Sequence, residues 1–108
     1  MNQPRFTAYL AKLKQVPIEP LPPQGEEWPA LVERISRPGN AAEVTEEAFD
    51  YWLEVLPPHW MGRNGFCFAE GMEPFRFFWR SGNRFFTRRL SWPETLDFCK
   101  LAGIRPPT

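Results

Sequence analysis

The chain has 108 residues, of which 43% are hydrophobic and 16% aromatic, so we expect one domain whose modest core is filled largely by rings. Thirteen lysines and arginines balance thirteen aspartates and glutamates, which excludes a strong overall attraction to nucleic acid or to a membrane. No apolar run approaches the roughly 20 residues that a membrane span needs, and two cysteines are too few for a disulfide framework. We therefore expect a cytoplasmic protein over residues 1–108 that has no membrane partner.

The first quarter of the chain is predicted to be a short helix followed by an extended connector. Residues 1–14 place Phe6, Leu10 and Leu13 at helical spacing, which is typical of an amphipathic helix. Residues 15–25 contain four prolines, which prevent a helix and favour an extended segment. Apolar residues between these prolines indicate that the connector lies against the body of the protein. A proline-rich ligand for another module is the functional alternative.

Residues 26–56 are predicted to form an acidic helical region. Trp28 and Ile35 belong to an apolar stripe at helical spacing, which predicts a helix that buries this stripe. The sequence Arg-Pro-Gly-Asn at residues 37–40 ends that helix. Thr45 is a favourable N-cap for a second helix, and two glutamates follow it in the first turn, where the helix dipole favours negative charge.

Residues 64–90 alternate in the period of two that is typical of strands, with short turns between three runs, which predicts an antiparallel meander. Residues 91–104 then form a C-terminal helix. Ser91 caps it, Glu94 completes a capping box, and Gly103 ends it. The predicted fold class is α+β, with N-terminal helices packed on a three-stranded antiparallel β-meander and a closing C-terminal helix.

Charge is unevenly distributed along the chain. Residues 19–54 hold nine acidic residues and two arginines, a net charge of −7, whereas residues 63–89 hold six arginines and two glutamates, a net charge of +4. The two regions either attract each other and are solvated, or form a bipolar surface with a basic binding face. A candidate acidic patch, of the kind that mimics nucleic acid or docks on a basic protein, consists of Glu43, Glu46, Glu47 and Asp50.

The hairpin of residues 75–90 is the segment whose chemistry most suggests a partner, because arginines and aromatic residues alternate along both of its strands. One interpretation is architectural: the rings supply the core and the arginines form a solvated reverse face. The other is binding of single-stranded nucleic acid, in which exposed rings stack on bases and guanidinium groups hold phosphates. The candidate binding face consists of Arg76, Phe78, Arg80, Arg84, Phe85, Phe86 and Arg88. Stacking requires that Phe78, Phe85 or Phe86 be exposed.

The sequence offers no set of residues for catalysis, and we predict no catalytic residues, no metal site and no cofactor. His59 is the only histidine, and it has no matched partner nearby in the sequence. Cys67 and Cys99 lack metal-ligand spacing and lie in apolar settings, so we expect buried thiols. No phosphate-binding glycine motif is present. A clear cleft joining His59 to either cysteine would revive an enzymatic hypothesis.

Two segments carry a resemblance to known proteins. The run YWLEVLPPHWMGRNGFCFAEGMEPFRFFWR at residues 51–80, with SWPETLDFCKLAGI at residues 91–104, resembles a family of short uncharacterised bacterial proteins carried on plasmids and other mobile elements. The resemblance implies a setting, the bacterial cytoplasm and mobile DNA, and it implies no catalytic residues.

Together these features predict a non-enzymatic protein-interaction module. We expect a protein partner, and an inhibitory or modulating role toward a larger nucleic-acid-handling or defence assembly. Binding of single-stranded nucleic acid through the arginine and aromatic face of the hairpin is the alternative.

Overall fold

A computed structural model describes residues 3–37 and 39–107. Met1, Asn2, Pro38 and Thr108, which belong to the predicted first helix, helix stop and tail, lie outside the described residues. The elements within the described residues are α1 (Gln3–Leu13), β1 (Ile18–Glu19), α2 (Trp28–Ile35), β2 (Ala41–Val44), α3 (Glu46–Val55), β3 (Trp60–Met61), β4 (Gly65–Phe68), β5 (Arg76–Ser81), β6 (Arg84–Arg89) and α4 (Trp92–Ala102). None of these helices is long and apolar enough to cross a membrane.

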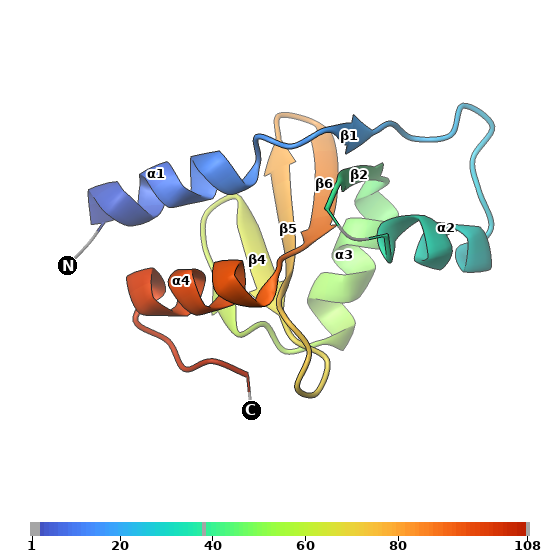
Figure 1. The fold of residues 1–108 in the computed structure, drawn as a ribbon. Helices are drawn as coiled ribbons and strands as arrows, with labels where there is room; N and C mark the ends of the chain where they lie inside the picture. The colour runs from blue at the N-terminus through green and yellow to red at the C-terminus, as the bar shows by residue number, and fades with distance from the viewer. Residues whose placement is uncertain (1–2, 38, 108) are drawn as a thin grey trace.

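The centre of the structure is a mixed sheet with the strand order β1-β2-β6-β5-β4-β3 (Figure 1). Strands β1 and β2 are parallel, and every other neighbouring pair is antiparallel. The predicted meander is present as β4, β5 and β6, and the α+β class is confirmed. The predicted sheet of three strands had too few strands, because β1 and β2 extend one edge of the meander and β3 extends the other.

The three additional strands are short and come from segments without a strand-like pattern. Strand β1 lies inside the proline-rich connector, where the amide of Ala41 donates to the carbonyl of Pro17 at 3.0 Å. Proline is tolerated there because an edge strand leaves one side of its backbone unpaired. Strand β2 joins the two helices of the acidic region and pairs with β6 along Ala42–Thr87 and Val44–Phe85. A segment of two to four residues is too short to show a period, so only its pairing identifies it as a strand.

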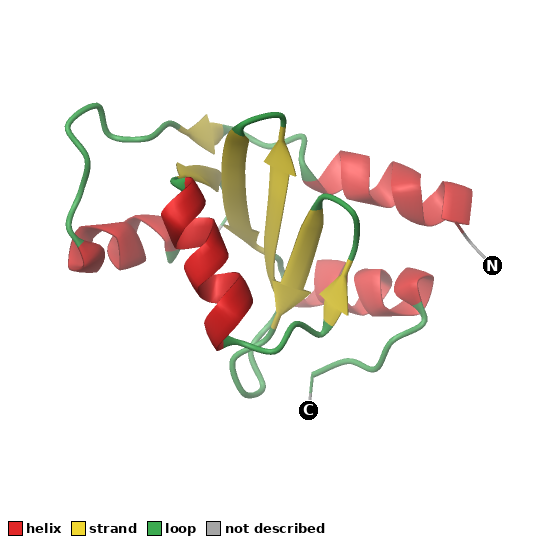
Figure 2. Cartoon of the chain, turned by 180° about the vertical axis from the view of Figure 1, so that it is seen from behind, coloured by secondary structure: helices red, strands yellow, loops and turns green. Residues whose placement is uncertain are grey.

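Helices cover both faces of the sheet (Figures 1 and 2). Helices α1 and α4 pack on one face, and α2 and α3 pack on the other. From the sequence, helices were expected on one face and a second face at least partly open to water, and this expectation was wrong. In β5, Phe77 and Trp79 point to the side of α1 and α4, whereas Phe78 points to the side of α3. The alternation in this strand therefore separates two cores rather than a core and a solvated surface.

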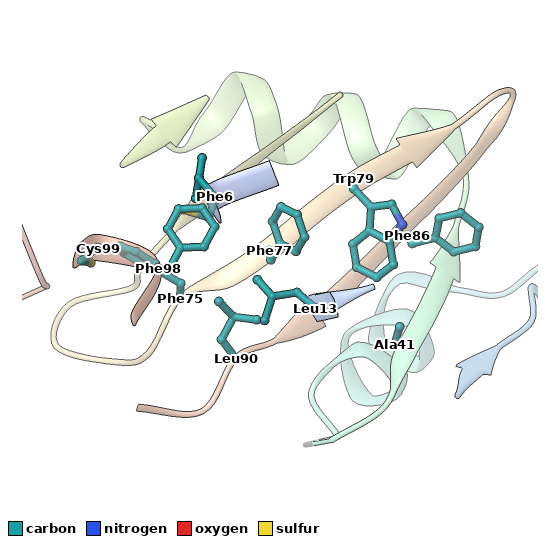
Figure 3. Close-up of a cluster of buried hydrophobic side chains, with 11 residues drawn as sticks. Phe6, Leu13, Ala41, Phe75, Phe77, Trp79, Phe86, Leu90, Phe98 and Cys99 are labelled. Carbon is teal, nitrogen blue, oxygen red and sulfur yellow. The ribbon is translucent and has the colours of Figure 1, made fainter. Parts of the chain in front are cut away.

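Each face of the sheet contributes to its own hydrophobic cluster. The cluster under α1 and α4, drawn in Figure 3, contains Phe6, Leu13, Ala41, Cys67, Phe75, Phe77, Trp79, Phe86, Leu90, Phe98 and Cys99. The cluster under α2 and α3 contains Leu31, Ile35, Ala42, Val44, Ala48, Phe49, Trp52, Phe66, Phe68, Phe78 and Phe85. Rings fill much of both clusters, as the aromatic content predicted.

The predicted helix ends are confirmed by their hydrogen bonds. The hydroxyl of Thr45 accepts from the amide of Ala48 at 3.1 Å. At the start of α4 the capping box is complete: the Ser91 hydroxyl accepts from the Glu94 amide, and the Glu94 carboxylate accepts from the Ser91 amide. Gly103 ends α4 with a φ of 72°, in the left-handed region that favours glycine.

Candidate functional site

The three hairpin rings that nucleic-acid stacking would require are all buried. Phe78 has an exposed fraction of 0%, and Phe85 and Phe86 have 8% and 4%. Phe78 stacks on Phe66 with a centroid distance of 4.9 Å and an interplanar angle of 5°. These rings therefore hold the sheet to its covering helices, and the described structure leaves none of them open for a base.

Two of the hairpin arginines are also internal, and each binds the last residue of a helix. Arg76 is 5% exposed, and its Nη1 donates to the carbonyl of Ile35, at the end of α2, at 2.8 Å. Arg88 is 6% exposed, and its Nη1 donates to the carbonyl of Leu13, at the end of α1, at 2.8 Å. The last carbonyls of a helix lack partners within it, and the helix dipole favours positive charge there. These arginines thus act as C-terminal caps on opposite faces of the sheet.

Of the remaining hairpin arginines, Arg80 and Arg84 are exposed and Arg89 is partly buried. Arg84 connects the two surfaces that the sequence analysis treated as separate, because its Nη2 and Nε lie 3.0 and 3.2 Å from the carboxylate oxygens of Glu43 on β2. Its guanidinium also lies 5.1 Å from the centroid of the Phe86 ring. The hydrogen bond from Arg84 is the main reason that the pKa of the Glu43 carboxyl is lowered. Glu43 is therefore already paired within the molecule.

The other three residues of the predicted acidic patch lie on α3. Glu46, Glu47 and Asp50 share this helix with a fourth carboxylate, Glu54, and with no basic residue. Within the described residues, no ion pair involves any of these four side chains. The outer surface of α3 therefore carries negative charge that the described part of the molecule does not neutralise by direct pairing.

Beside these carboxylates the structure exposes an aromatic pair. Trp28, the first residue of α2, is 47% exposed, although the sequence analysis placed it in the buried stripe. Its ring lies 4.9 Å from that of Tyr51, which is also 47% exposed, and Val55 follows Tyr51 by one helical turn. The surface formed by Trp28, Tyr51 and Val55 with the carboxylates of Glu47, Asp50 and Glu54 is called here the α3 face.

The aromatic part of the α3 face was not predicted from the sequence, although one feature of the sequence indicates it. The buried stripe of α3 includes Ala48, Phe49 and Trp52. Tyr51 and Val55 are four residues apart and fall outside this stripe, so they share an exposed line on the helix. Trp28 was expected to be buried, but its ring packs only partly, on Trp52 and Tyr51, and 47% of the residue stays exposed.

Among the described residues, no hydrogen bond joins the side chain of His59 to either cysteine. The Nδ1 atom of His59 accepts a hydrogen bond from the amide of Ala69 at 3.2 Å. Burial raises the pKa of the Cys67 thiol strongly and that of Cys99 as well, which disfavours the thiolate that nucleophilic chemistry needs. Among residues 3–37 and 39–107, no group of three or more His, Cys, Asp or Glu side chains is placed to hold a metal ion.

Comparisons with known proteins identify no relative. No protein-family model matches the chain, and searches of the curated proteins and of the solved structures give no significant match. The residues of the α3 face therefore carry the functional argument by themselves.

Proposed function

We propose that the protein is a non-enzymatic interaction module that binds a basic protein through the α3 face. The observation that carries this proposal is the exposed Trp28–Tyr51 pair beside the carboxylates of α3 that have no ion-pair partner in the described structure. Tryptophan and tyrosine are among the residues most enriched at the energetic centres of protein interfaces. Exposed apolar patches with a polar rim are typical of interaction sites.

The aromatic part of the α3 face is held rigidly from below. The Trp28 ring stacks on that of Trp52 with a centroid distance of 5.1 Å and an interplanar angle of 19°. The Trp52 ring in turn lies 5.5 Å from that of Phe78, in the centre of the sheet. An anchor that is already ordered loses less conformational entropy on binding, so more of its contact energy remains as affinity.

The charge of the α3 face determines the kind of partner. Glu47, Tyr51 and Val55 follow one another at four-residue spacing on one line of the helix, and Asp50 and Glu54 lie on the adjacent line, so carboxylates flank the apolar anchors. A surface with lysines or arginines around an apolar socket complements this arrangement. Proteins that handle nucleic acid present such basic surfaces to phosphates. This supports an inhibitory or modulating role toward a nucleic-acid-handling assembly, in keeping with the mobile-element setting that the sequence resemblance implies.

Quantitative affinity capture from a bacterial lysate tests the proposal. Wild-type protein is expected to retain a stoichiometric basic partner, and the Tyr51→Ser and Glu47→Lys/Asp50→Lys variants are expected to lose it. Trp92→Ser is the matched control, because Trp92 is a comparably exposed aromatic residue at the start of α4, on the opposite side of the sheet. Capture of no stoichiometric protein, or equal retention by all variants, would contradict the proposal.

A further inference from the structure

A cleft of about 1070 Å³ lies on the side of the molecule opposite to the α3 face. One wall is a face of α1, the other is formed by residues 60–65, and the C-terminal end of α4 borders it. Sites for small molecules typically have volumes of about 300–1,000 Å³, so this cleft is large enough for one. It is called here the α1 cleft.

The apolar part of the α1 cleft is rigid. The Trp60 indole lies over Gly62, where an added Cβ would come within 2.4 Å of the ring, so only glycine allows this placement. The same indole packs edge-on against Phe6 and Phe98, with centroid distances of 5.4 and 5.3 Å. Aromatic rings favour such edge contacts, and three neighbours fix the position of the indole.

The floor of the cleft is formed by side chains of β5. Phe77 and Trp79, which Figure 3 shows side by side on this strand, have ring centroids 5.3 Å apart and an interplanar angle of 24°. Both rings are almost fully buried and pack into the cluster beneath them. The cleft therefore combines a fixed indole in one wall with an aromatic floor that does not move independently of the core.

The charge of the α1 cleft has one sign, although the whole chain is neutral. Among the described residues that line it, the charged ones are Lys14, Arg63 and Lys100, and none is acidic. None of the three takes part in an ion pair within the described structure. Burial lowers the pKa of Lys14, so an anion beside this ammonium group would offset the cost of its desolvation.

We propose that the α1 cleft binds a small organic anion with an apolar, ring-containing body and a carboxylate or phosphate group. The body of the ligand packs against the Trp60 indole and the apolar side chains of α1 that line the cleft, and its acid group pairs with Lys14 at the C-terminal end of α1. Apolar walls with a few convergent polar groups are the usual composition of ligand sites. This site is independent of the α3 face, so either assignment can fail without the other.

Fluorescence titration with 1-anilinonaphthalene-8-sulfonate tests the proposal, and uncharged N-phenyl-1-naphthylamine serves as the matched probe. Both probes should bind saturably at one site. The Lys14→Gln variant should weaken binding of the anionic probe by up to about fivefold, the upper end of the effect of one partly exposed ion contact. Lys100→Gln, at the other end of the cleft, should weaken it less. Both variants should leave the uncharged probe unchanged. Lys12→Gln, on the exposed side of α1, is the control for loss of general charge.

Competition with 1-naphthoate and 1-naphthyl phosphate then identifies the acid group. The more effective competitor assigns a carboxylate or a phosphate to the site, and displacement by neither overturns the proposal. Non-saturable binding of the anionic probe, or an equal effect of Lys12→Gln and Lys14→Gln, would also overturn it. Thr7→Trp fills the cleft from an exposed position on α1 and should abolish binding of both probes. Retention of the thermal unfolding midpoint establishes that each variant is folded.

Discussion

Arg88 and Glu94 form an ion pair at the junction of three elements, with the Nη2 atom of Arg88 lying 3.0 Å from each carboxylate oxygen of Glu94. The same guanidinium binds the carbonyl of Leu13 at the end of α1, and the same carboxylate completes the capping box with Ser91 at the start of α4. The hydroxyl of Tyr9 adds a bond of 2.8 Å to the carbonyl of Glu94. An arginine that the sequence analysis assigned to a binding face thus connects β6 with two helices.

Removal of the negative charge at this junction should destabilise the fold. Glu94→Gln leaves the buried guanidinium of Arg88 without its counterion, so the free energy of unfolding should fall by about 2 kcal/mol. Urea denaturation measures the change. The control is Glu73→Gln, whose ion pair with Arg89 is much more exposed and whose loss should cost less than about 0.5 kcal/mol. Equal losses in the free energy of unfolding for the two variants would show that the buried ion pair contributes no more to stability than the exposed one.

The same carboxylate should make stability depend on pH. Burial by itself would raise the pKa of Glu94, but hydrogen bonds from Ser91 and the charge of Arg88 outweigh it, so the pKa lies below its ordinary value of 4.5. Because the folded state favours the ionised form, its stabilisation is complete above pH 4.5 and is lost as the pH falls through the lowered pKa. The stability difference between wild type and Glu94→Gln should therefore shrink from pH 7 to about pH 3. A constant or growing difference would contradict this.

The helices, their caps and the central hairpin could be predicted because each depends on residues that are close in sequence. The capping box of Ser91 and Glu94 is contained in four residues, and the period of β5 in six. The covering of the second face could not be predicted in this way. It depends on α2 and α3 lying behind the sheet, and an alternation of rings and arginines looks the same whether the second face meets water or another core.

The candidate site shows the same limit. The carboxylates of α3 could be predicted to lie on the surface from their residue type alone, because charged groups are rarely buried without partners. Residue type also led to an error at Arg76 and Arg88, since both are buried against helix ends that are distant in sequence. Glu43 was assigned to the acidic patch as an unpaired carboxylate. Its partner, Arg84, could not be recognised from the sequence, because it lies 41 positions away and is brought close only by the pairing of β2 with β6.

The two buried arginines should differ in their contributions to stability, although both bind a helix end. Arg88→Met leaves the Leu13 carbonyl without its donor and the partly buried Glu94 carboxylate without its counterion, so we expect a cost of about 3 kcal/mol. Among the described residues, no carboxylate lies within hydrogen-bonding distance of Arg76. Desolvation lowers the pKa of Arg76 to about 10, so burial of its charge is unfavourable. Arg76→Met should therefore cost less than about 1.5 kcal/mol.

Equilibrium unfolding in urea at neutral pH compares the two variants directly, because methionine replaces a similar volume at both positions. A larger loss for Arg76→Met than for Arg88→Met would show that the ion pair with Glu94 is not the dominant contribution at the junction. Unchanged circular dichroism of both variants establishes that the loss is one of stability rather than of fold.

Phe78 and Trp28 belong to one stack of rings, and substitution should separate their roles. Phe78 is completely buried, so Phe78→Ala should reduce the free energy of unfolding by about 4 kcal/mol through lost burial and a cavity. Trp28 is 47% exposed, so Trp28→Ala should cost only about 1 kcal/mol. In affinity capture the stable Trp28→Ala variant should nevertheless lose the basic partner, because its ring is one of the two proposed anchors.

The comparison also distinguishes the two interpretations of the hairpin. If Phe78 were a stacking platform for bases, Phe78→Ala would leave stability nearly unchanged and would weaken binding of single-stranded oligonucleotides at low salt, where phosphate contacts are strongest. Burial of its ring against Trp52 and Phe66 predicts the opposite, a large loss of stability without an effect on nucleic acid. A loss below about 1 kcal/mol for Phe78→Ala would contradict the closed second face of the sheet, because burial of a phenylalanine is worth more than that.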